Sequence, residues 1–438
     1  MRDRIGAVVN LEARGGGGRA FMFETGRGNA ETIDLFSGAA RRADGGASSS
    51  SLSIFVYENM PNGTDFTISR NRGVAGVNFA FIGRPSQYHS PTATPDNLDQ
   101  GAVQHIGSQA LEATDALLRA DALPVTGRNV VYGDYLGLFT IVHSLDLGWT
   151  LLALTALLGA FAAWGARHAT GLTAPDVGRG MLSGLWIVAT GIVVAHGVRV
   201  LAGPMSSRAE SADVYYTLLR RLPWMEAGTG LAMAAVALAL LAGRQAFGPK
   251  LLAGVIIVAV AAAQILGGLD PVVLGAGVVA LVLTVWSQSA PRTVWGGWLG
   301  LIALIFVFGF IAQAAAPEAA LVFIWPGLLA AIAAAACALI GARLESPRSV
   351  IPAVVATVVG GAWILNLSHQ VFLGVGMDLP GVLALMTVLV LLFLVPLAPR
   401  SKGTLAAAAA ACLILACGLS LTARFAEPAP PPAADGPT

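Results

Sequence analysis

A single histidine, His89, stands in residues 87–99 (QYHSPTATPDNLD), a run rich in proline and other turn-forming residues. This run follows the apolar residues 74–82 (VAGVNFAFI), which lie between Gly73 and Gly83. A short apolar stretch bounded by glycines predicts a buried strand, so we expect His89 on a loop past the end of that strand. Open α/β sheets place ligands there, and a loop imidazole serves as a metal ligand or proton carrier. Taken alone, however, the pattern favours a surface histidine in a proline-rich turn.

The elements that would position this loop are predicted across the first 140 residues. The predicted strands are residues 4–13, 20–24, 52–57 and 74–82. The predicted helices are residues 29–42, a short segment after Thr64, and residues 97–120. In the last of these, the side chains predicted to face the core are Val103, Ile106, Ala110, Ala113 and Leu117. Strands alternating with helices predict an α/β layer domain, which we place at residues 1–124.

Composition separates this region from the rest of the chain. Of the 438 residues, 55% are hydrophobic and only 12% are charged, whereas soluble proteins have about 25% charged residues. Beyond Ser144 the sequence becomes a series of apolar stretches, and a membrane-spanning helix needs about 20 apolar residues. About ten spans are predicted, the fifth short enough to leave eight or nine open: residues 147–164, 180–200, 224–242, 251–269, 272–287, 295–313, 319–340, 351–371, 380–397 and 405–421. The sequence therefore predicts an all-α polytopic transmembrane bundle at residues 147–422.

The charge, glycine and cysteine content of the chain limits the classes of partner and ligand that it is expected to bind. Residues 125–146 form an amphipathic lead-in to the bundle, and residues 423–438 form a proline-rich tail predicted to be disordered. A formal net charge of +1 gives no argument for a nucleic-acid partner, and the lipid bilayer is the partner that the apolar stretches imply. The glycine run at residues 15–18 lacks the Lys-Ser/Thr pair of a phosphate-binding loop. All three cysteines lie in apolar stretches and are interpreted as small membrane-core residues.

Charges in the short loops predict the orientation, because cytoplasmic loops collect lysine and arginine. The loops after the odd-numbered predicted spans hold the basic residues Arg167, Arg179, Arg244, Lys250, Arg292, Arg343, Arg348, Arg400 and Lys402. The loops after spans four, six and eight hold only acids, namely Asp270, Glu318 and Asp378. The loop after span two breaks the pattern, with Arg208, Arg220 and Arg221 beside Glu210 and Asp213. The majority places the amino-terminal domain on the non-cytoplasmic side, which is periplasmic or extracellular if the source is bacterial.

Three short segments carry a family resemblance: Asn10-Leu11-Glu12, then Asn62-Gly63-Thr64-Asp65-Phe66, then Tyr88-His89-Ser90. In this order they resemble the second half of the catalytic domain in the membrane-bound branch of the di-zinc aminopeptidase family. That branch includes the vacuolar membrane protease and the endoplasmic reticulum metallopeptidase. The resemblance covers about residues 4–122. It extends to residues 132–139 (YGDYLGLF), which are similar to the family's lead-in to its membrane bundle.

The resemblance implies a zinc site and a peptide substrate. In the family, two zinc ions polarise a peptide carbonyl and generate hydroxide near neutral pH. By position, Glu12 matches the ligand of one zinc and His89 the ligand of the other. An acid at the end of one strand and an imidazole past the end of another can converge on one edge of a sheet. Asp65 is expected beside the metals or in the substrate pocket, and Tyr88 or Asp96 can orient the His89 ring.

Other residues of the family site have no counterpart in the sequence. The family also uses a first histidine, a bridging aspartate, and a Glu-Glu pair that supplies a ligand and the general base. These would precede Asn10, where Asp3 is the only acid, while His105 falls in a predicted helix and His143 at the membrane boundary. We therefore expect an amino-terminally truncated member with two of the five usual protein ligands and no general base. This chain alone is then predicted to lack peptidase activity and to bind zinc weakly.

Simpler interpretations stay open beside these. Without the resemblance, Glu12 is an ordinary solvated acid at a strand end, and Asp65 equally caps the helix that carries Phe66. Polar residues in the apolar stretches, such as Arg199 and His369, lie near predicted span ends, where they can reach interfacial water. They are interpreted as forming hydrogen bonds between helices and anchoring the interface, rather than lining a transport path. Two functions follow: a membrane-anchored zinc aminopeptidase-like hydrolase, or a non-catalytic polytopic membrane protein acting as a pseudo-peptidase, scaffold or transporter.

Overall fold

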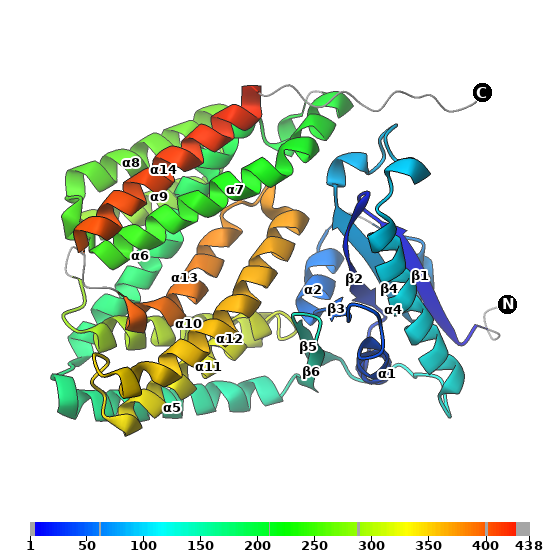
Figure 1. The fold of residues 1–438 in the computed structure, drawn as a ribbon, viewed down its shortest axis with the longest axis horizontal. Coiled ribbons are helices and arrows are strands. Elements are labelled where there is room, and N and C mark those ends of the chain that lie inside the picture. Colours follow the sequence, from blue (N-terminus) through cyan, green and yellow to red (C-terminus); the bar gives the residue numbers. More distant parts are fainter. Residues whose placement is uncertain (1–4, 61–62, 210, 287–289, 399–401, 426–438) are drawn as a thin grey trace. The chain divides into compact units, whose positions relative to one another are not determined.

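The structure is a computed structural model that describes residues 5–60, 63–209, 211–286, 290–398 and 402–425. The described residues up to Leu151 form one compact unit with Gly309–Val322. Leu152–Phe308 and the described residues from Phe323 onward form the second. The first unit is built on an α/β layer and the second is helical, which confirms the predicted fold class (Figure 1). Asn62 of the second motif and the tail beyond residue 425 lie outside the described residues.

A four-stranded mixed sheet forms the centre of the first unit. Its strands, in spatial order, are β1 (Ala7–Ala13), β4 (Ala75–Gly83), β2 (Gly17–Thr25) and β3 (Ser48–Ser49). β1 and β4 run parallel, β2 runs antiparallel to β4, and β3 pairs parallel with β2. Three of the four predicted strands are therefore confirmed. Because β1 and β4 are parallel neighbours, their carboxyl ends meet at one edge of the sheet.

Helices α1 (Ala30–Ala40) and α4 (Gln100–Arg119) cover one face of this sheet, as their predicted periodicity requires. They pack on apolar side chains of the strands to form the core of the unit, which includes Ala20, Met22, Ile33, Phe36, Val77, Phe79, Phe81, Ala102, Ile106, Ala113 and Tyr132. Val103 was predicted to face this core, but it is 43% exposed. The buried stripe of α4 passes through Ala102 and Ile106, and Val103 lies one helical step outside it.

The opposite face is covered by α2 (Ser51–Glu58) and α3 (Phe66–Arg70). The prediction of a strand at residues 52–57 is wrong, because α2 occupies this segment. Ser50 caps the helix by accepting a hydrogen bond from the Leu52 amide, and helical turns bring buried Ile54 and half-buried Tyr57 towards the same side. Tyr57 meets Phe23 of β2 edge-on, with 4.9 Å between the ring centroids. Alternating apolar residues in a short segment are compatible with both helix and strand.

A β-bulge in β2 decides which face receives Glu24. Met22 lies opposite Phe79 and Glu24 lies opposite Asn78, so Phe23 is an extra residue in the ladder. Strict alternation would place Glu24 on the face of Ala20 and Met22, under α1 and α4. The extra residue instead turns Glu24 to the face of α2 and α3, where its side chain meets Asn78.

A β-hairpin follows the sheet, where the sequence indicated only an amphipathic lead-in. Its strands are β5 (Val130–Tyr135) and β6 (Phe139–Ser144). Leu136 and Gly137 in the turn both have positive φ, of 54° and 76°, which is typical of the tight turns that join two strands. A bridge from Ser50 to Gly133 and the burial of Tyr132 join the hairpin to the α/β layer.

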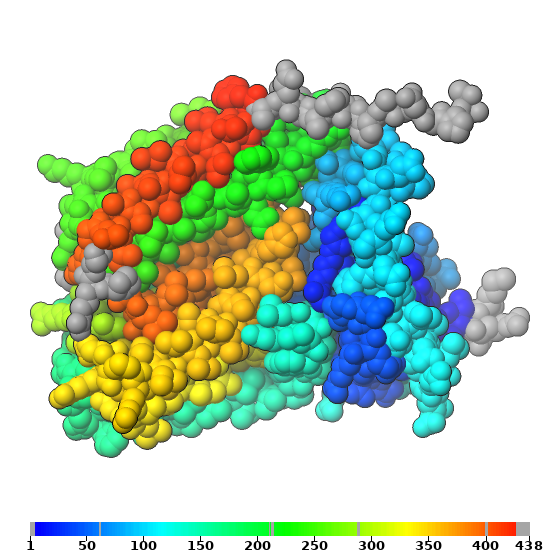
Figure 2. Space-filling model, in the orientation of Figure 1, coloured from blue at the N-terminus to red at the C-terminus, as the bar shows by residue number. Residues whose placement is uncertain are grey.

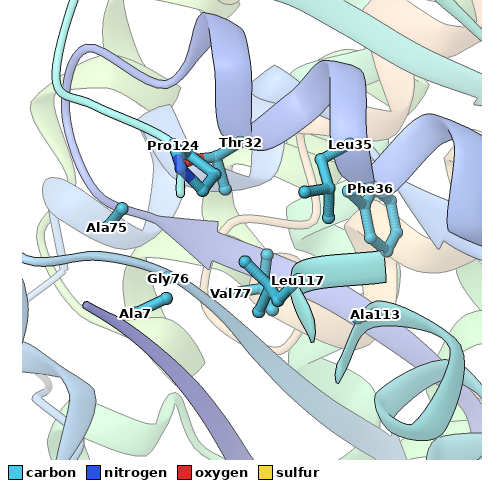
Figure 3. Close-up of a pocket in the computed structure, with 10 residues that line it drawn as sticks. All are labelled: Ala7, Thr32, Leu35, Phe36, Ala75, Gly76, Val77, Ala113, Leu117 and Pro124. Atoms are coloured by element: carbon cyan, nitrogen blue, oxygen red, sulfur yellow. The ribbon is translucent and has the colours of Figure 1, made fainter. Parts of the chain in front are cut away.

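A small apolar cavity lies on the face covered by α1 and α4, towards the amino ends of β1 and β4 (Figure 3). Its lining residues include Ala7, Phe36, Ala75 and Leu117. Almost all of the lining is hydrocarbon, so the cavity offers few groups for catalysis. It also lies at the opposite end of β1 from Glu12, and it is therefore not the candidate site.

Ten helices lie in the described part of the chain from Leu147 onward, and each predicted apolar stretch is helical. They are α5 (Leu147–Thr170), α6 (Ala174–Arg199), α7 (Ala212–Ala242), α8 (Pro249–Ala262), α9 (Pro271–Trp286), α10 (Val294–Ala315), α11 (Leu321–Ile340), α12 (Pro347–Val371), α13 (Val382–Leu394) and α14 (Lys402–Phe425). Eight are long and apolar enough to cross a membrane once short helical extensions are included. The two that contain α9 and α13 are shorter.

Within the second unit, α6 is the most buried of the eight long spans and contacts α7, α8, α9 and α13. Side chains of α14 pack along α7 (Figures 1 and 2). Close helix contacts depend on small residues, since a side chain at Gly180 would collide with the Gly296 carbonyl oxygen. The prediction that Arg199 reaches water is wrong, because its side chain is fully buried. His369 of α12 forms the predicted hydrogen bond between helices, with 2.6 Å between its Nδ1 and Glu226 Oε1 of α7.

Candidate functional site

Glu12 lies at the carboxyl end of β1, opposite Ala80 of β4, and is half-buried. The Asn10 side chain, two residues earlier on the same face, donates from Nδ2 to Glu12 Oε1 at 3.1 Å. The same amide nitrogen lies 3.0 Å from Asn78 Oδ1 on β4. These bonds fix the direction of one carboxylate oxygen of Glu12, because the Asn10 amide is itself held from the neighbouring strand.

Asn10, Asn78 and Glu24 form a polar row across β1, β4 and β2. Strand register produces it, because Asn78 lies opposite Asn10 on one side and opposite Glu24 on the other. Asn78 donates from Nδ2 to Glu24 Oε2 at 2.8 Å and to Thr64 Oγ1 at 2.9 Å. Asn78 and Glu24 are both fully buried. Arg70 of α3 completes the row, with 2.6 Å between its Nη1 and Glu24 Oε1.

The electrostatics of the row follow from its burial. Loss of solvent raises the pKa of the Glu24 carboxyl above its usual value, more than the Asn78 hydrogen bond and the Arg70 charge lower it. Glu58 at the end of α2 raises it further. Burial likewise raises the pKa of the Tyr57 hydroxyl, and the nearby charges of Glu24 and Glu12 add to this effect. The carboxylates of Glu12 and Glu24 therefore both act electrostatically on Tyr57.

His89 lies beyond the carboxyl end of β4, after a short 3-10 turn at Pro85–Gln87. Its backbone has a φ of +52°, which few residues other than glycine adopt. Its ring is exposed and stacks on Tyr88, with 3.9 Å between the ring centroids and 19° between the planes. The Gln87 side chain packs so closely on Gly16 that any side chain there would meet its Oε1 atom. The loop that carries His89 therefore lies against the turn that follows Glu12.

The other predicted site residues lie on the surface. Asp65 is exposed and occupies the position before α3, but its side chain makes no capping hydrogen bond. Asp96 is exposed in the 3-10 turn Pro95–Asn97. Of the predicted residues, the structure thus stacks Tyr88 on His89 and puts Glu12 at the edge where the β4 loop begins. The roles of all five stay predictions.

The donor types at this edge suit zinc, which binds carboxylate oxygen and imidazole nitrogen, usually through three or four protein ligands. Among the described residues, however, no group of three or more His, Cys, Asp or Glu side chains is arranged to hold a metal ion. Glu12 and His89 alone do not make a complete zinc site. The residues present therefore fit part of a metal centre.

The sequence analysis missed the polar row, although Asn10 lies within the first motif. A signal was present in β2, where Glu24 is the only acid in the otherwise apolar residues 20–24. Acidic residues are almost never fully buried unless they are paired, so such a position indicates a partner. The partners themselves, Asn78 and Arg70, are apparent only once the strands are in register.

Residues 1–114 match peptidase family M28. These residues, about a quarter of the chain, are similar to that family. Three similar curated proteins are endoplasmic reticulum metallopeptidase 1 of Homo sapiens, the same protein of Mus musculus, and the vacuolar membrane protease of Eremothecium gossypii. The human protein is 32% identical over 149 residues, which cover 33% of this chain and 16% of that protein. The mouse protein is 31% identical over the same shares of each chain.

The Eremothecium gossypii protease is 30% identical over 142 residues, which cover 32% of this chain and 14% of the protease. The chain thus matches less than a fifth of the length of these M28 relatives. No solved structure matches it. These findings confirm the predicted resemblance, and the apolar helices together with the membrane relatives identify a membrane protein with an M28 region.

Proposed function

We propose that this chain forms part of a membrane-bound, zinc-dependent peptidase of the aminopeptidase type. One observation carries the proposal. In a region that matches family M28, Glu12 lies at the carboxyl end of β1 and His89 follows the carboxyl end of its parallel neighbour β4, so both lie towards the same edge of the sheet. Ligand sites of open sheets occupy such edges.

In this proposal Glu12 and His89 each bind one of two zinc ions, and a peptide with a free amino terminus is the substrate. Asn10 orients the Glu12 carboxylate, and Tyr88 restricts the His89 ring by stacking. Bound zinc would supply polarisation of the peptide carbonyl. The described residues hold no group of three potential ligands, so Glu12 and His89 supply only part of the zinc site in this proposal.

Zinc binding by the full chain tests the proposal. Purified in detergent, the chain is expected to bind zinc weakly in competition with a chelating dye, and to leave an aminoacyl-coumarin substrate intact. Glu12→Ala and His89→Ala should each weaken the residual binding by about tenfold, as expected for loss of one ligand. Asp34→Ala and His168→Ala remove exposed residues of similar type and serve as matched controls.

Two results would contradict different parts of the proposal. Tight stoichiometric zinc, or release of coumarin, would show that the chain holds a complete centre. Residual zinc binding that is equal in wild type, Glu12→Ala and His89→Ala would remove both residues from the metal site.

A second function, a non-catalytic membrane protein that binds peptides without cleaving them, draws on the same absence of a third ligand among the described residues. The two functions separate experimentally. A pseudo-peptidase would bind a free-amino-terminal peptide with equal affinity in zinc and in EDTA. The zinc-dependent proposal requires binding that falls in EDTA.

The proposed location is an integral membrane protein with the α/β unit on the non-cytoplasmic side. The acidic loops at Asp270, Glu318 and Asp378 support this sidedness, since basic residues collect on the cytoplasmic side. The hydrogen bonds of Glu318 with Arg27 and Asn129 support placing that loop on the same side as the α/β residues. Protease protection in sealed vesicles would test it, because a shielded amino-terminal region in right-side-out vesicles contradicts this orientation.

A further inference from the structure

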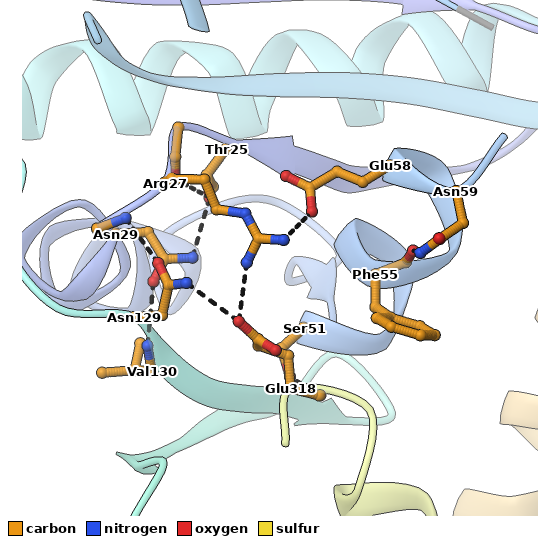
Figure 4. A network of polar contacts seen from close by, with 12 residues as sticks. Thr25, Arg27, Asn29, Ser51, Phe55, Glu58, Asn59, Asn129, Val130 and Glu318 are labelled. Carbon is orange, nitrogen blue, oxygen red and sulfur yellow. Dashed lines mark hydrogen bonds and ion pairs between the residues drawn. The ribbon is translucent and has the colours of Figure 1, made fainter. Parts of the chain in front are cut away.

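The turn between α10 and α11 belongs to the same compact unit as the α/β residues, although residues 145–315 separate it from β6 in the sequence. Glu318 in this turn hydrogen-bonds Arg27, Asn129 and Ser51 of the α/β layer (Figure 4). Its Oε1 atom accepts from Arg27 Nη1 at 2.8 Å and from Asn129 Nδ2 at 3.0 Å. Its backbone oxygen accepts from Ser51 Oγ at 2.6 Å. We call Arg27, Ser51 and Asn129 the Glu318 receptor.

The receptor is itself fixed in place. Arg27 also forms an ion pair with Glu58, the last residue of α2. The Asn129 side chain accepts a hydrogen bond from the Gly28 amide, with 2.6 Å from nitrogen to Oδ1. The side chains of Glu318 and Glu58 are only 17% and 15% exposed. An arginine shared by two shielded carboxylates is held more firmly than an exposed surface pair.

These contacts hold α2 at both ends. Ser51 begins the helix and bonds the Glu318 backbone, while Glu58 ends it and pairs with the arginine that Glu318 also binds. The end of α2 also carries Tyr57, which packs edge-on against Phe23, the residue before Glu24 in β2. The position of α2 over Glu24 therefore depends on a residue far away in sequence.

We propose that the turn between α10 and α11 is a docking element, in which the Glu318 carboxylate occupies the Glu318 receptor and sets the position of α2 over the polar row. The surface recognises an acidic turn of this same chain. Arginine and asparagine donate to one carboxylate oxygen, and the Ser51 hydroxyl donates to the backbone oxygen of the same residue. This inference does not depend on zinc binding or on peptidase activity.

Hydrogen–deuterium exchange of the full chain in lipid nanodiscs tests the proposal. Glu318→Ala is expected to speed amide exchange in residues 51–58 on the order of tenfold. Loss of hydrogen bonds to a charged group lowers the free energy of local opening by an amount that corresponds to such a change in rate. Exchange in residues 25–30 should also rise, while exchange in α4 stays unchanged. Unchanged exchange at residues 51–58 overturns the proposal.

Glu112→Ala is the matched control. Glu112 pairs with Arg42 in the same unit, and Arg42 has a side-chain exposure of 51%, close to the 53% of Arg27. Losing this pair should leave exchange in residues 51–58 as in the wild type. An equal increase in Glu112→Ala and Glu318→Ala would show a general loss of stability, which also overturns the proposal.

Two milder variants keep the test decisive if Glu318→Ala does not fold. Glu318→Gln keeps an oxygen for Asn129 but loses the charge that binds Arg27, so its exchange should fall between wild type and Glu318→Ala. Arg27→Ala should speed exchange at residues 51–58, and adding Glu318→Gln to it should produce less than the sum of the two effects. Strictly additive effects would show that the two residues do not act through one contact and would reject the docking element.

Discussion

Among the described residues, one charged side chain in each unit is completely buried, and the two have different kinds of partner. In the α/β unit, Glu24 has an ion-pair partner, Arg70, and a hydrogen-bond donor, Asn78. In the helical unit, Arg199 at the end of α6 donates to backbone carbonyls instead. Its three acceptors, each 2.8–3.0 Å away, are the carbonyl oxygens of Met377, Gly203 and Pro204.

Glu24 is connected to the candidate site through hydrogen bonds, whereas Arg199 stabilises the packing of the helical unit. The bonds of Glu24 continue through Asn78 and Asn10 to Glu12, which lies at the accessible edge of the sheet. The bonds of Arg199 end in chain segments that follow α6 and α12, where carbonyls lack helical partners. We therefore connect a buried charge with the candidate site only where its hydrogen bonds continue to a residue at the accessible edge of the sheet, as those of Glu24 do.

Arg199→Met should have the largest effect. It leaves three carbonyl oxygens without their donor inside the helical unit, which we expect to cost roughly 3–5 kcal/mol. Thermal unfolding in detergent, followed by the fluorescence of the bundle tryptophans, measures the loss. Arg199→Lys retains the charge but has fewer hydrogen-bond donors, so its unfolding midpoint should lie between those of wild type and Arg199→Met. A midpoint for Arg199→Met within a degree of wild type would contradict a structural role for this residue.

Arg70→Ala should cost about 2–3 kcal/mol near pH 8, because it leaves Glu24 buried without its counter-charge. The cost should shrink towards pH 5. A carboxyl whose pKa is raised in the folded state contributes stability below its unfolded pKa, and that stability is lost as pH rises through the folded value. The double variant Arg70→Ala/Glu24→Gln removes the stranded charge and should recover most of the loss at pH 8. No recovery would mean that Arg70 acts through packing alone.

Protonation of His105 in α4 should have the smallest effect on the stability of the fold, about 1 kcal/mol. Its Nδ1 accepts from the Ala20 amide at 3.0 Å, and its Nε2 lies 2.9 Å from the Gly46 carbonyl oxygen, so the ring is neutral. Burial lowers the pKa of His105, the Arg19 charge lowers it further, and the Gly46 bond opposes both. A group whose pKa is lowered in the folded state contributes stability above its unfolded-state pKa. That stability is lost as the pH falls through the folded-state pKa.

Amide exchange in β2 should therefore accelerate from pH 7 to pH 5, after correction for the intrinsic rate. His105→Gln should flatten this dependence, and His168→Ala, at an exposed position outside the α/β unit, should leave it unchanged. An unaltered pH dependence in His105→Gln would show that another group titrates.

Much of the secondary structure could be predicted from local patterns, and the exceptions have local reasons. Ten apolar stretches gave ten helices, because hydropathy over about 20 residues is a strong signal. Residues 52–57 became a helix because the Ser50 cap and packing against β2 outweighed their strand-like alternation. The position of Glu12 at a strand end was predictable. The partners of Asn10 were not, since they depend on the register of β1 with β4 and on the bulge in β2.

Local sequence patterns were enough to predict an α/β region ahead of a set of membrane-length helices, with a carboxylate at the end of one strand and an imidazole after another. These are properties of short segments, set by hydrophobic period and turn chemistry. The hydrogen bond of Glu24 with Asn78, the complete burial of Arg199 and the contact of Glu318 with Arg27 became apparent from the fold alone. Each of these depends on which distant segments pack together, and no local pattern encodes that.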